Sequence, residues 1–191
     1  MKRLFFLGWM VFGMTALAKS QLHVNVQWQK QTTAVSRDTL LYDDHSKLTW
    51  DNFFVKKDEG NNTAALTTSG FGFTAGIYSR SGKGTLDINV FCYFLPSKSW
   101  VKDGHASEYI LNHEQHHFDI SYIGTCVFMK KLREAKINTN NYSSILTKIY
   151  NETYEYMSNM QDSYDNETNN GMIKERQDDW NRKVTAMLAD L

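Results

Sequence analysis

The sequence His-Glu-Gln-His-His at residues 113–117 constrains this chain more than any other feature. It contains the pattern H-E-x-x-H in a segment whose apolar residues recur at spacings of three and four, which predicts a helix. Residues i and i+4 lie on the same side of a helix, so the imidazoles of His113 and His117 can reach one ion. Two neutral imidazoles leave room on a tetrahedral zinc ion for a third protein ligand and a water molecule. The sequence therefore predicts a Zn²⁺ site with His113 and His117 as ligands.

Glu114 is the candidate general base of this site. It lies about 100° around the helix from His113, which is too far for an easy third ligand. Its carboxylate can instead lean over a water molecule that zinc acidifies to a pKa of about 7, and take the proton as that water attacks a carbonyl. The combination predicts hydrolysis of peptide bonds. A helix whose histidines only pack and hydrogen bond is the alternative.

The other histidines and Asp119 are expected to stay off the metal. His116 borders the face of His113, but a place at the surface or behind the ligands is favoured over ligation. Asp119 is expected to point away from the ligands and to hydrogen bond at the helix surface or towards a sheet. The remaining histidines are scattered and are expected to be ordinary polar residues; they are His23, His45 and His105.

The segment before the helix reads as β structure. Apolar and polar residues alternate in residues 22–26 and 86–94, which is the period of a half-buried strand. Residues 64–80 are rich in Thr, Gly and aromatic side chains, and Ser-Gly-Lys-Gly at residues 81–84 is typical of a tight turn. These patterns predict a hairpin, whose second strand ends at Pro96, the only proline.

After Gly104 the apolar spacing becomes that of three helices, with Asn-rich loops expected at residues 139–141 and 166–170. The fold class predicted for residues 19–191 is a single α+β domain, in which an N-terminal antiparallel or mixed sheet is followed by three helices, the first carrying H-E-x-x-H. The expected apolar faces are Ile110, His113, His117, Ile120, Gly124, Val127 and Phe128 in the first helix, Tyr142, Ile145, Leu146, Ile149, Thr153, Tyr156, Met157, Met160 and Tyr164 in the second, and Ile173, Gln177, Trp180, Val184, Met187 and Leu191 in the third.

Residues 1–18 predict a secretory signal peptide. Lys2 and Arg3 precede a mainly apolar run over residues 4–17, and Ala-Leu-Ala at residues 16–18 fits the small-x-small cleavage pattern. An uncleaved membrane anchor is the alternative, but the run is shorter than the roughly 20 residues that a span needs. The protein is therefore expected to be secreted or periplasmic, with no membrane span after signal cleavage.

Charge indicates which kind of partner the chain can bind, and cysteine content indicates whether it can form a disulfide. Lys plus Arg and Asp plus Glu each number 21, so no basic field would hold nucleic acid, and a peptide or protein substrate is the expected partner. Export permits a disulfide, and Cys92 and Cys126 either pair or remain buried free thiols, with free thiols slightly favoured. The oligomeric state stays open.

Four stretches of the chain, taken in order, carry a resemblance to a known family. The chain resembles a bacterial family of predicted secreted zinc-dependent proteases, also described as a domain of unknown function. The resemblance implies a zincin-like fold and metal-dependent peptide hydrolysis, with His113, Glu114 and His117 matching the family motif position by position. The stretches are Leu-Thr-Trp-Asp-Asn-Phe at residues 48–53, Ser-Trp-Val at 99–101, residues 111–120 around H-E-x-x-H, and Tyr-Asp-Asn-Glu-Thr-Asn-Asn-Gly at 164–171, followed by Gln177 and Trp180.

The last stretch departs from the family in one position. The family pattern Tyr-Asp-x-x-Thr-x-His-Gly matches at Tyr164, Asp165, Thr168 and Gly171, but Asn170 stands where the family has His. That His is a natural third zinc ligand, and an amide oxygen is a weaker one. Three interpretations stay open: Asp165 is the third ligand, Asn170 ligates weakly, or the site is degenerate and the protein is a zincin-fold binding protein of the cell envelope.

Two further expectations concern the reaction. Tyr164 could donate a hydrogen bond to a developing oxyanion, but it also completes the apolar face of the second helix, and the structural role is favoured. The strand over residues 85–94 is expected beside the H-E-x-x-H helix, and as a sheet edge it would pair with an extended substrate. The predicted function is that of an exported zinc peptidase.

Overall fold

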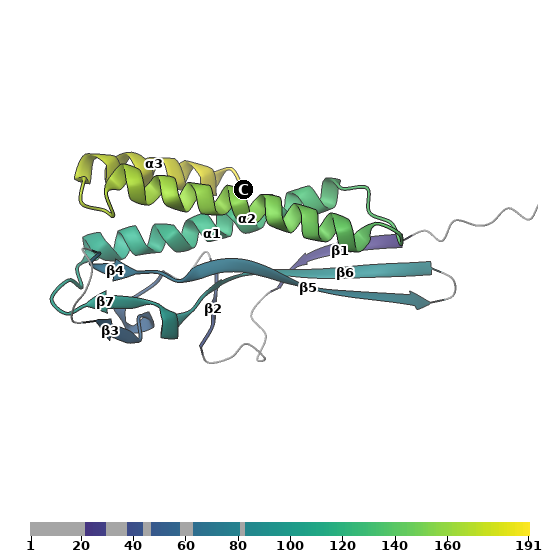
Figure 1. Ribbon diagram of the computed structural model, residues 1–191, viewed down its shortest axis with the longest axis horizontal. Helices are drawn as coiled ribbons and strands as arrows, with labels where there is room; N and C mark the ends of the chain where they lie inside the picture. Colours follow the sequence, from purple (N-terminus) through teal and green to yellow (C-terminus); the bar gives the residue numbers. More distant parts are fainter. Residues whose placement is uncertain (1–21, 30–37, 44–46, 58–62, 81–82) are drawn as a thin grey trace, which may run out of the picture.

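A computed structural model describes residues 22–29, 38–43, 47–57, 63–80 and 83–191. It is an α+β arrangement in which a mixed sheet is followed by three helices that cover one face of it (Figure 1). This order confirms the coarse fold prediction. The predicted signal peptide at residues 1–18 and His45 lie outside the described residues. In the part of the chain that the structure describes, no helix is both long and apolar enough to cross a membrane.

The main sheet is organised around β6 (Lys83–Phe94). On one side β6 pairs along its whole length with antiparallel β5 (Ser69–Arg80), as the predicted hairpin requires. On the other side it pairs with parallel β1 (Leu22–Trp28) and, at its end, with antiparallel β2 (Leu40–Leu41). The inward residues are Leu86, Ile88, Val90, Cys92 and Phe94, all at most 1% exposed, so the predicted alternation is confirmed.

β6 lies beside α1 as expected, but it is a central strand, so the condition under which it would pair with an extended substrate is not met. Alternation of apolar residues reports which face of a strand is buried, and it carries no information about the strands on either side. A backbone that is hydrogen bonded on both sides has no groups left to pair with a substrate. β6 therefore offers no free edge to an extended ligand.

A second, three-stranded sheet lies at one end of the molecule, in the order β3-β7-β4. Its strands are β3 (Val55–Lys57), β7 (Trp100–Lys102) and β4 (Ala65–Leu66). Among the described residues β4 pairs with β7 alone, so it is one of the two edge strands of this sheet, and β3 is the other. Pro96 begins a 3₁₀ turn soon after β6 ends, in agreement with the predicted strand end.

The three helices are α1 (Glu108–Glu134), α2 (Tyr142–Thr168) and α3 (Lys174–Ala189). The side chain of Ser107 caps α1 by accepting a hydrogen bond from the backbone N–H of Ile110. α1 lies against β5 and β6 and also contacts both other helices, and Tyr150 of α2 reaches Phe71 of β5 beside it (Figure 1). The helix with H-E-x-x-H is therefore held from both sides.

Two hydrophobic clusters fix α1 on the sheet. In the first, Ile120 and Phe128 of α1 pack with the inward side chains of β6, such as Ile88. In the second, Phe118 packs against Phe94 at a ring-centroid distance of 5.7 Å. Each such buried side chain contributes about 1.5–3 kcal/mol of transfer free energy, so α1 is a rigid base for the residues it carries.

The end of α2 differs from the prediction. The loop expected at residues 166–170 is wrong in its first half, because α2 continues through Thr168. The backbone then turns at Asn169 and Asn170, whose φ values of 50° and 54° are left-handed, and Gly171 follows with φ of 78°. Asn and Gly tolerate this region better than other residues, which explains why the helix ends here.

Three residues of the expected apolar faces are exposed. Tyr156 is 40% exposed, because the adjacent Met157 takes the inward position on α2. Ile173 and Leu191 lie just outside the ends of α3 and are 45% and 57% exposed. In contrast, Trp180 and Val184 of α3 are buried as expected.

Both cysteines are free thiols, as favoured from the sequence. Cys92 is fully buried on β6, and burial raises the pKa of its thiol. Cys126 on α1 is partly buried, and the pKa of its thiol is raised for the same reason. A raised thiol pKa keeps these side chains neutral and unreactive, as expected of packing residues.

Candidate metal centre

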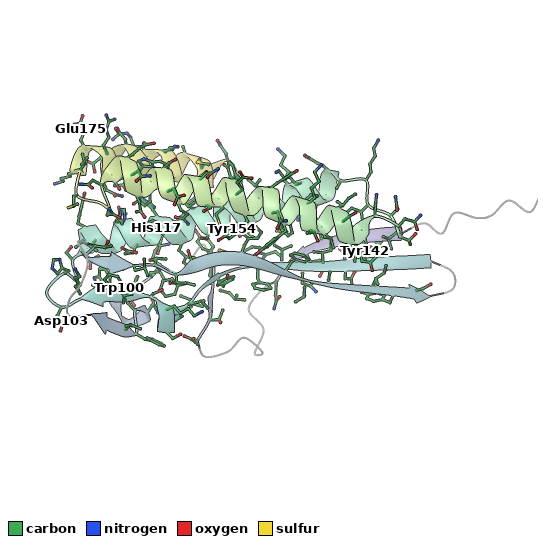
Figure 2. All side chains as sticks on the ribbon, viewed as in Figure 1. Trp100, Asp103, His117, Tyr142, Tyr154 and Glu175 are labelled. Carbon is green, nitrogen blue, oxygen red and sulfur yellow. The ribbon has the colours of Figure 1, made fainter. Side chains whose placement is uncertain are left out.

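Three potential ligand atoms meet between α1 and α2. The Nε2 atoms of His113 and His117 are 3.3 Å apart, and Asp165 Oδ1 lies 3.2 Å from the first and 3.0 Å from the second. Among the described His, Cys, Asp and Glu residues, these three form the one group that could hold a metal ion. Figure 2 labels His117, which lies where the helices face the sheet. The structure thus brings the two predicted histidine ligands to Asp165.

The spacing of these atoms fits a tetrahedral ion. Ligands bound to zinc at about 2.0 Å along tetrahedral directions are about 3.3 Å from one another. The observed separations of 3.0–3.3 Å match this edge length without any movement of the side chains. Two imidazoles and one carboxylate are also a ligand set found in catalytic zinc sites, which keep the fourth position open. The residues present therefore fit zinc.

A glutamine holds each imidazole from behind. His113 Nδ1 lies 2.8 Å from Gln177 Oε1, and His117 Nδ1 lies 2.6 Å from Gln161 Oε1. An amide oxygen only accepts, so each Nδ1 donates and Nε2 is the nitrogen left for a metal. Gln161 is itself fixed, since its Nε2 donates to the carbonyl oxygen of His117 at 2.8 Å.

Glu114 stands beside this group with one oxygen free. The residue is only 3% exposed, and its Oε2 is buried with no hydrogen-bond partner among the described residues. Burial raises the pKa of the carboxyl, although the nearby His117 and His113 oppose the shift. An unpaired buried carboxylate oxygen is costly, so this oxygen can accept a hydrogen bond from a group that enters the site.

The stretch over residues 164–171 forms the wall behind His113. The ring of Tyr164 stacks on that of His113 at a centroid distance of 4.5 Å. The Tyr164 hydroxyl donates to the His113 carbonyl at 3.3 Å and accepts from Gln177 Nε2 at 2.6 Å. Since the hydroxyl is occupied in this way and the residue is fully buried, the favoured structural role is supported over oxyanion donation.

Gly171 must be a glycine at this point of the chain. Its φ is 78°, and a Cβ would lie 3.2 Å from His113 Nδ1. Thr168 holds it there, because Thr168 Oγ1 accepts from the Gly171 N–H at 3.1 Å. Tyr109 fixes the other side by donating to the Gly171 carbonyl at 2.6 Å. The turn after α2 is therefore closely fitted to the imidazole of His113.

His116 and Asp119 form a separate buried network on the far side of α1. His116 Nδ1 lies 3.0 Å from Asp119 Oδ2, and its Nε2 lies 2.9 Å from Asn181 Oδ1. Asp119 Oδ1 also accepts from the hydroxyl of Tyr42 at 2.9 Å and from Gln115 Nε2 at 2.8 Å. With both ring nitrogens engaged, His116 lies off the ligand group, and Asp119 points away from it as expected but is buried and not at the helix surface.

The remaining candidates lie off the ligand atoms. Asn170 is an exposed residue of the cavity wall, and its backbone N–H donates to the Asp165 carbonyl at 2.8 Å. His105 is an exposed residue of the same wall, and His23 is exposed on β1. Gln161 was not predicted from the sequence. Its place four residues before Asp165 was the available signal, because i and i+4 share a helix face.

The candidate site opens into a cavity of about 660 Å³. Its floor is α1, with His113, Glu114 and His117. One wall is formed by residues 63–67 around β4, and the other by α2 and the turn that follows it. This volume is in the range of sites that bind small ligands or short peptide segments.

No protein-family model, no curated protein and no solved structure matches this chain. The family resemblance therefore stands on the residues of the four stretches alone. Three of them meet around α1: the backbone N–H of Leu48 donates to Gln115 Oε1 at 2.8 Å, and the stretch over 164–171 packs on His113. The remaining stretch, at residues 99–101, lies in and next to β7.

Zinc uptake should release a proton from His117. Burial opposes charge on this imidazole, but hydrogen bonding to Asp165 and the charge of Glu114 outweigh burial and raise the pKa of His117 to about 9. The same contacts hold the pKa of the Asp165 carboxyl well below its usual range, so Asp165 has no proton to lose at neutral pH. At about pH 7 to 8 we expect about one proton per zinc ion, measured with an indicator dye in weakly buffered solution.

The sign of the pH dependence follows from the raised pKa. A proton on His117 competes with the metal at every pH below the pKa, so the apparent zinc affinity should rise about tenfold per pH unit between about pH 7 and 8.5. Competition against a chelator of known affinity measures this slope. A zinc affinity that stays constant over the interval would show that His117 is neutral before the metal binds.

Proposed function

We propose that this chain is an exported zinc-dependent peptidase with a zincin-like fold. The observation that carries the proposal is the meeting of His113 Nε2, His117 Nε2 and Asp165 Oδ1 within 3.0–3.3 Å, beside the unpartnered Glu114 Oε2. The zincin-like fold is supported by the family resemblance and by an H-E-x-x-H helix packed on a mixed sheet. Export is supported by the signal sequence at residues 1–18, which points to a secreted or periplasmic protein.

Glu114, which lies next to the candidate ligands, favours zinc over other metals. Two histidines and a carboxylate also suit iron(II) in oxygenases. A buried carboxylate with a raised pKa and a free oxygen is what water activation needs, and an oxygenase site has no use for it. The balance of 21 basic and 21 acidic residues favours a peptide over nucleic acid as the substrate.

In the proposed reaction Glu114 moves the protons. A bound zinc ion would polarise the scissile carbonyl and acidify water. Glu114 takes a proton as the water oxygen bonds to the carbonyl carbon, and passes it to the amide nitrogen as the C–N bond breaks. The second proton of the water leaves the new carboxyl group for the amine, so the products are a carboxylate and an ammonium group. The raised pKa of Glu114 brings it closer to neutral pH, which suits a group that must both accept and return a proton.

β4 replaces β6 as the strand proposed to bind an extended substrate. It is an edge strand of its sheet, and residues 63–67, unlike those of the other edge strand β3, line the cavity beside Glu114. Thr67 connects the two elements, because its hydroxyl donates to the Glu114 carbonyl at 3.2 Å. A peptide that added a strand along this edge would lie across the candidate metal site.

The alternative of a degenerate zincin-fold binding protein is favoured only by Asn170. A binding protein would be expected if the chain lacked a third metal ligand, because Asn170 stands where the family has histidine. Asp165 Oδ1 lies within 3.2 Å of both Nε2 atoms, so three donor atoms are present without the Asn170 side chain. The peptidase is therefore the better-supported function.

Elemental analysis of the purified protein tests the proposal. We expect about one zinc ion per chain, lost in His113→Ala, and hydrolysis of unfolded casein that stops on chelation and returns with zinc. Iron in place of zinc would overturn the choice of metal, and casein hydrolysis that persists after chelation would exclude the metal-dependent mechanism. Zinc without hydrolysis of any peptide would instead favour the binding protein.

A further inference from the structure

The side chains around the cavity are almost free of charge. Within the described part of the chain, no Lys or Arg lines it, and its acidic residues are Glu114 and Asp165, which both belong to the candidate metal site. Outside the metal group, the basic residue of the wall is His105, which is exposed. A free peptide terminus is a full charge, and its removal from water needs a partner of opposite charge. The cavity offers no dedicated partner to either terminus.

Exposed apolar side chains gather at the rim of the cavity. Leu66 on β4 is 43% exposed, Tyr154 on α2 is 53% exposed and Met172 after α2 is 61% exposed. They stand on opposite walls, and Tyr154 is labelled where α2 faces the sheet (Figure 2). Met157, which is 5% exposed, adds an apolar surface deeper in the cavity. Exposed apolar groups around a concave site mark surfaces that bind apolar ligands.

We propose that the cleft takes an internal, uncharged segment of an extended polypeptide with large apolar side chains, and that the protein is an endopeptidase. This inference rests on the proposed peptidase function. The side chains of the segment pack between Leu66 on one wall and Tyr154 and Met172 on the other. Its backbone lies along β4, and its termini remain in water beyond the cavity. The hydrolytic step is the one described for Glu114, with water as the only co-reactant.

Peptide binding to the zinc-loaded Glu114→Gln protein tests this substrate class without turnover. The probes are fluorescently labelled decapeptides with blocked ends, carrying either a Leu-Phe pair or a Lys-Asp pair at the centre. A third probe places Leu-Phe at a free C-terminal carboxylate. Fluorescence anisotropy should show binding of the blocked Leu-Phe peptide at least about tenfold tighter than binding of the other two.

Tyr154→Asp and Tyr156→Asp make a matched pair of variants. Both replace an exposed tyrosine of α2, but Tyr156 is not among the residues that line the cavity. Tyr154→Asp should weaken binding of the blocked Leu-Phe peptide by about tenfold, and Tyr156→Asp should change it less than about twofold. Equal effects of the two substitutions would overturn the proposed placement of the apolar segment.

The two proposals fail in different ways. Tighter binding of the free-carboxylate or Lys-Asp peptide, with cleavage by the unmodified protein, would overturn the endopeptidase inference and leave the peptidase intact. Tight binding of the blocked Leu-Phe peptide without cleavage by the unmodified protein would support the cleft specificity and reject hydrolysis. Binding of none of the peptides by a protein that holds zinc would overturn both.

Discussion

Replacing Glu114 with Gln should abolish peptide hydrolysis while one zinc ion stays bound. The amide cannot accept a proton from water, and loss of a general base lowers kcat by about 10²- to 10⁴-fold. The ligand atoms belong to other residues, so zinc per chain should not change. Elemental analysis and hydrolysis of a blocked Leu-Phe peptide measure the two quantities on the same sample.

Glu108→Gln is the control for this substitution. Glu108 lies in the first turn of the same helix, is exposed and does not line the cavity, so its replacement should leave kcat unchanged. The melting temperature of Glu114→Gln should also remain within a few degrees, because burial already disfavours the charged form of Glu114. Undiminished hydrolysis by Glu114→Gln would rule out the proposed base.

The sequence predicted best those features that depend on a short, regular spacing of residues within one strand or one helix. Alternation in residues 86–94 gave the buried face of β6, and the i, i+4 spacing put His113 and His117 on one side of α1. It could not give the position of β6 within the sheet, because the order of strands depends on contacts between distant segments. The edge that lines the cavity belongs to β4, a strand of two residues with no recognisable alternation.

The end of α2 shows a second limit. Asn-rich segments favour turns, so residues 166–170 read as a loop. The helix continues because Thr168 is fully buried and its hydroxyl donates to the Tyr164 carbonyl at 2.7 Å. This extra turn matters for the site, since the turn that follows it brings Gly171 against His113. Tertiary packing here overrides the local preference of the residues.

The residues behind the ligands were the least predictable. Gln161 is one of many polar residues on α2, and its spacing of four from Asp165 places it on the same helix face without showing what it contacts. Its role appears only when His117 Nδ1 is found 2.6 Å from its Oε1. Gln177 belongs to the family resemblance, but its contact with His113 joins residues 64 positions apart. Such contacts between helices are set by helix packing and not by local sequence.

Asp165→Asn should reduce zinc affinity by about a hundredfold. A zinc site with four ligands is worth roughly 10–16 kcal/mol, so one ligand contributes about 3 kcal/mol, or two decades in the dissociation constant. The substitution keeps the size of the side chain but replaces a carboxylate by a neutral amide, which is the weaker zinc ligand. Chelator competition measures the affinity, and circular dichroism confirms that the fold is intact.

Asn170→Gly decides between Asp165 and Asn170 as the third ligand. Glycine removes the amide and accepts the left-handed φ of 54° at this position, so the backbone is not strained as it would be by alanine. If Asp165 is the ligand, Asn170→Gly should bind zinc as tightly as the unmodified protein. Loss of zinc in Asn170→Gly with retention in Asp165→Asn would assign the third position to the amide. The site would then depend on a weak ligand in place of the family histidine, which would restore the case for a binding protein that has lost catalysis.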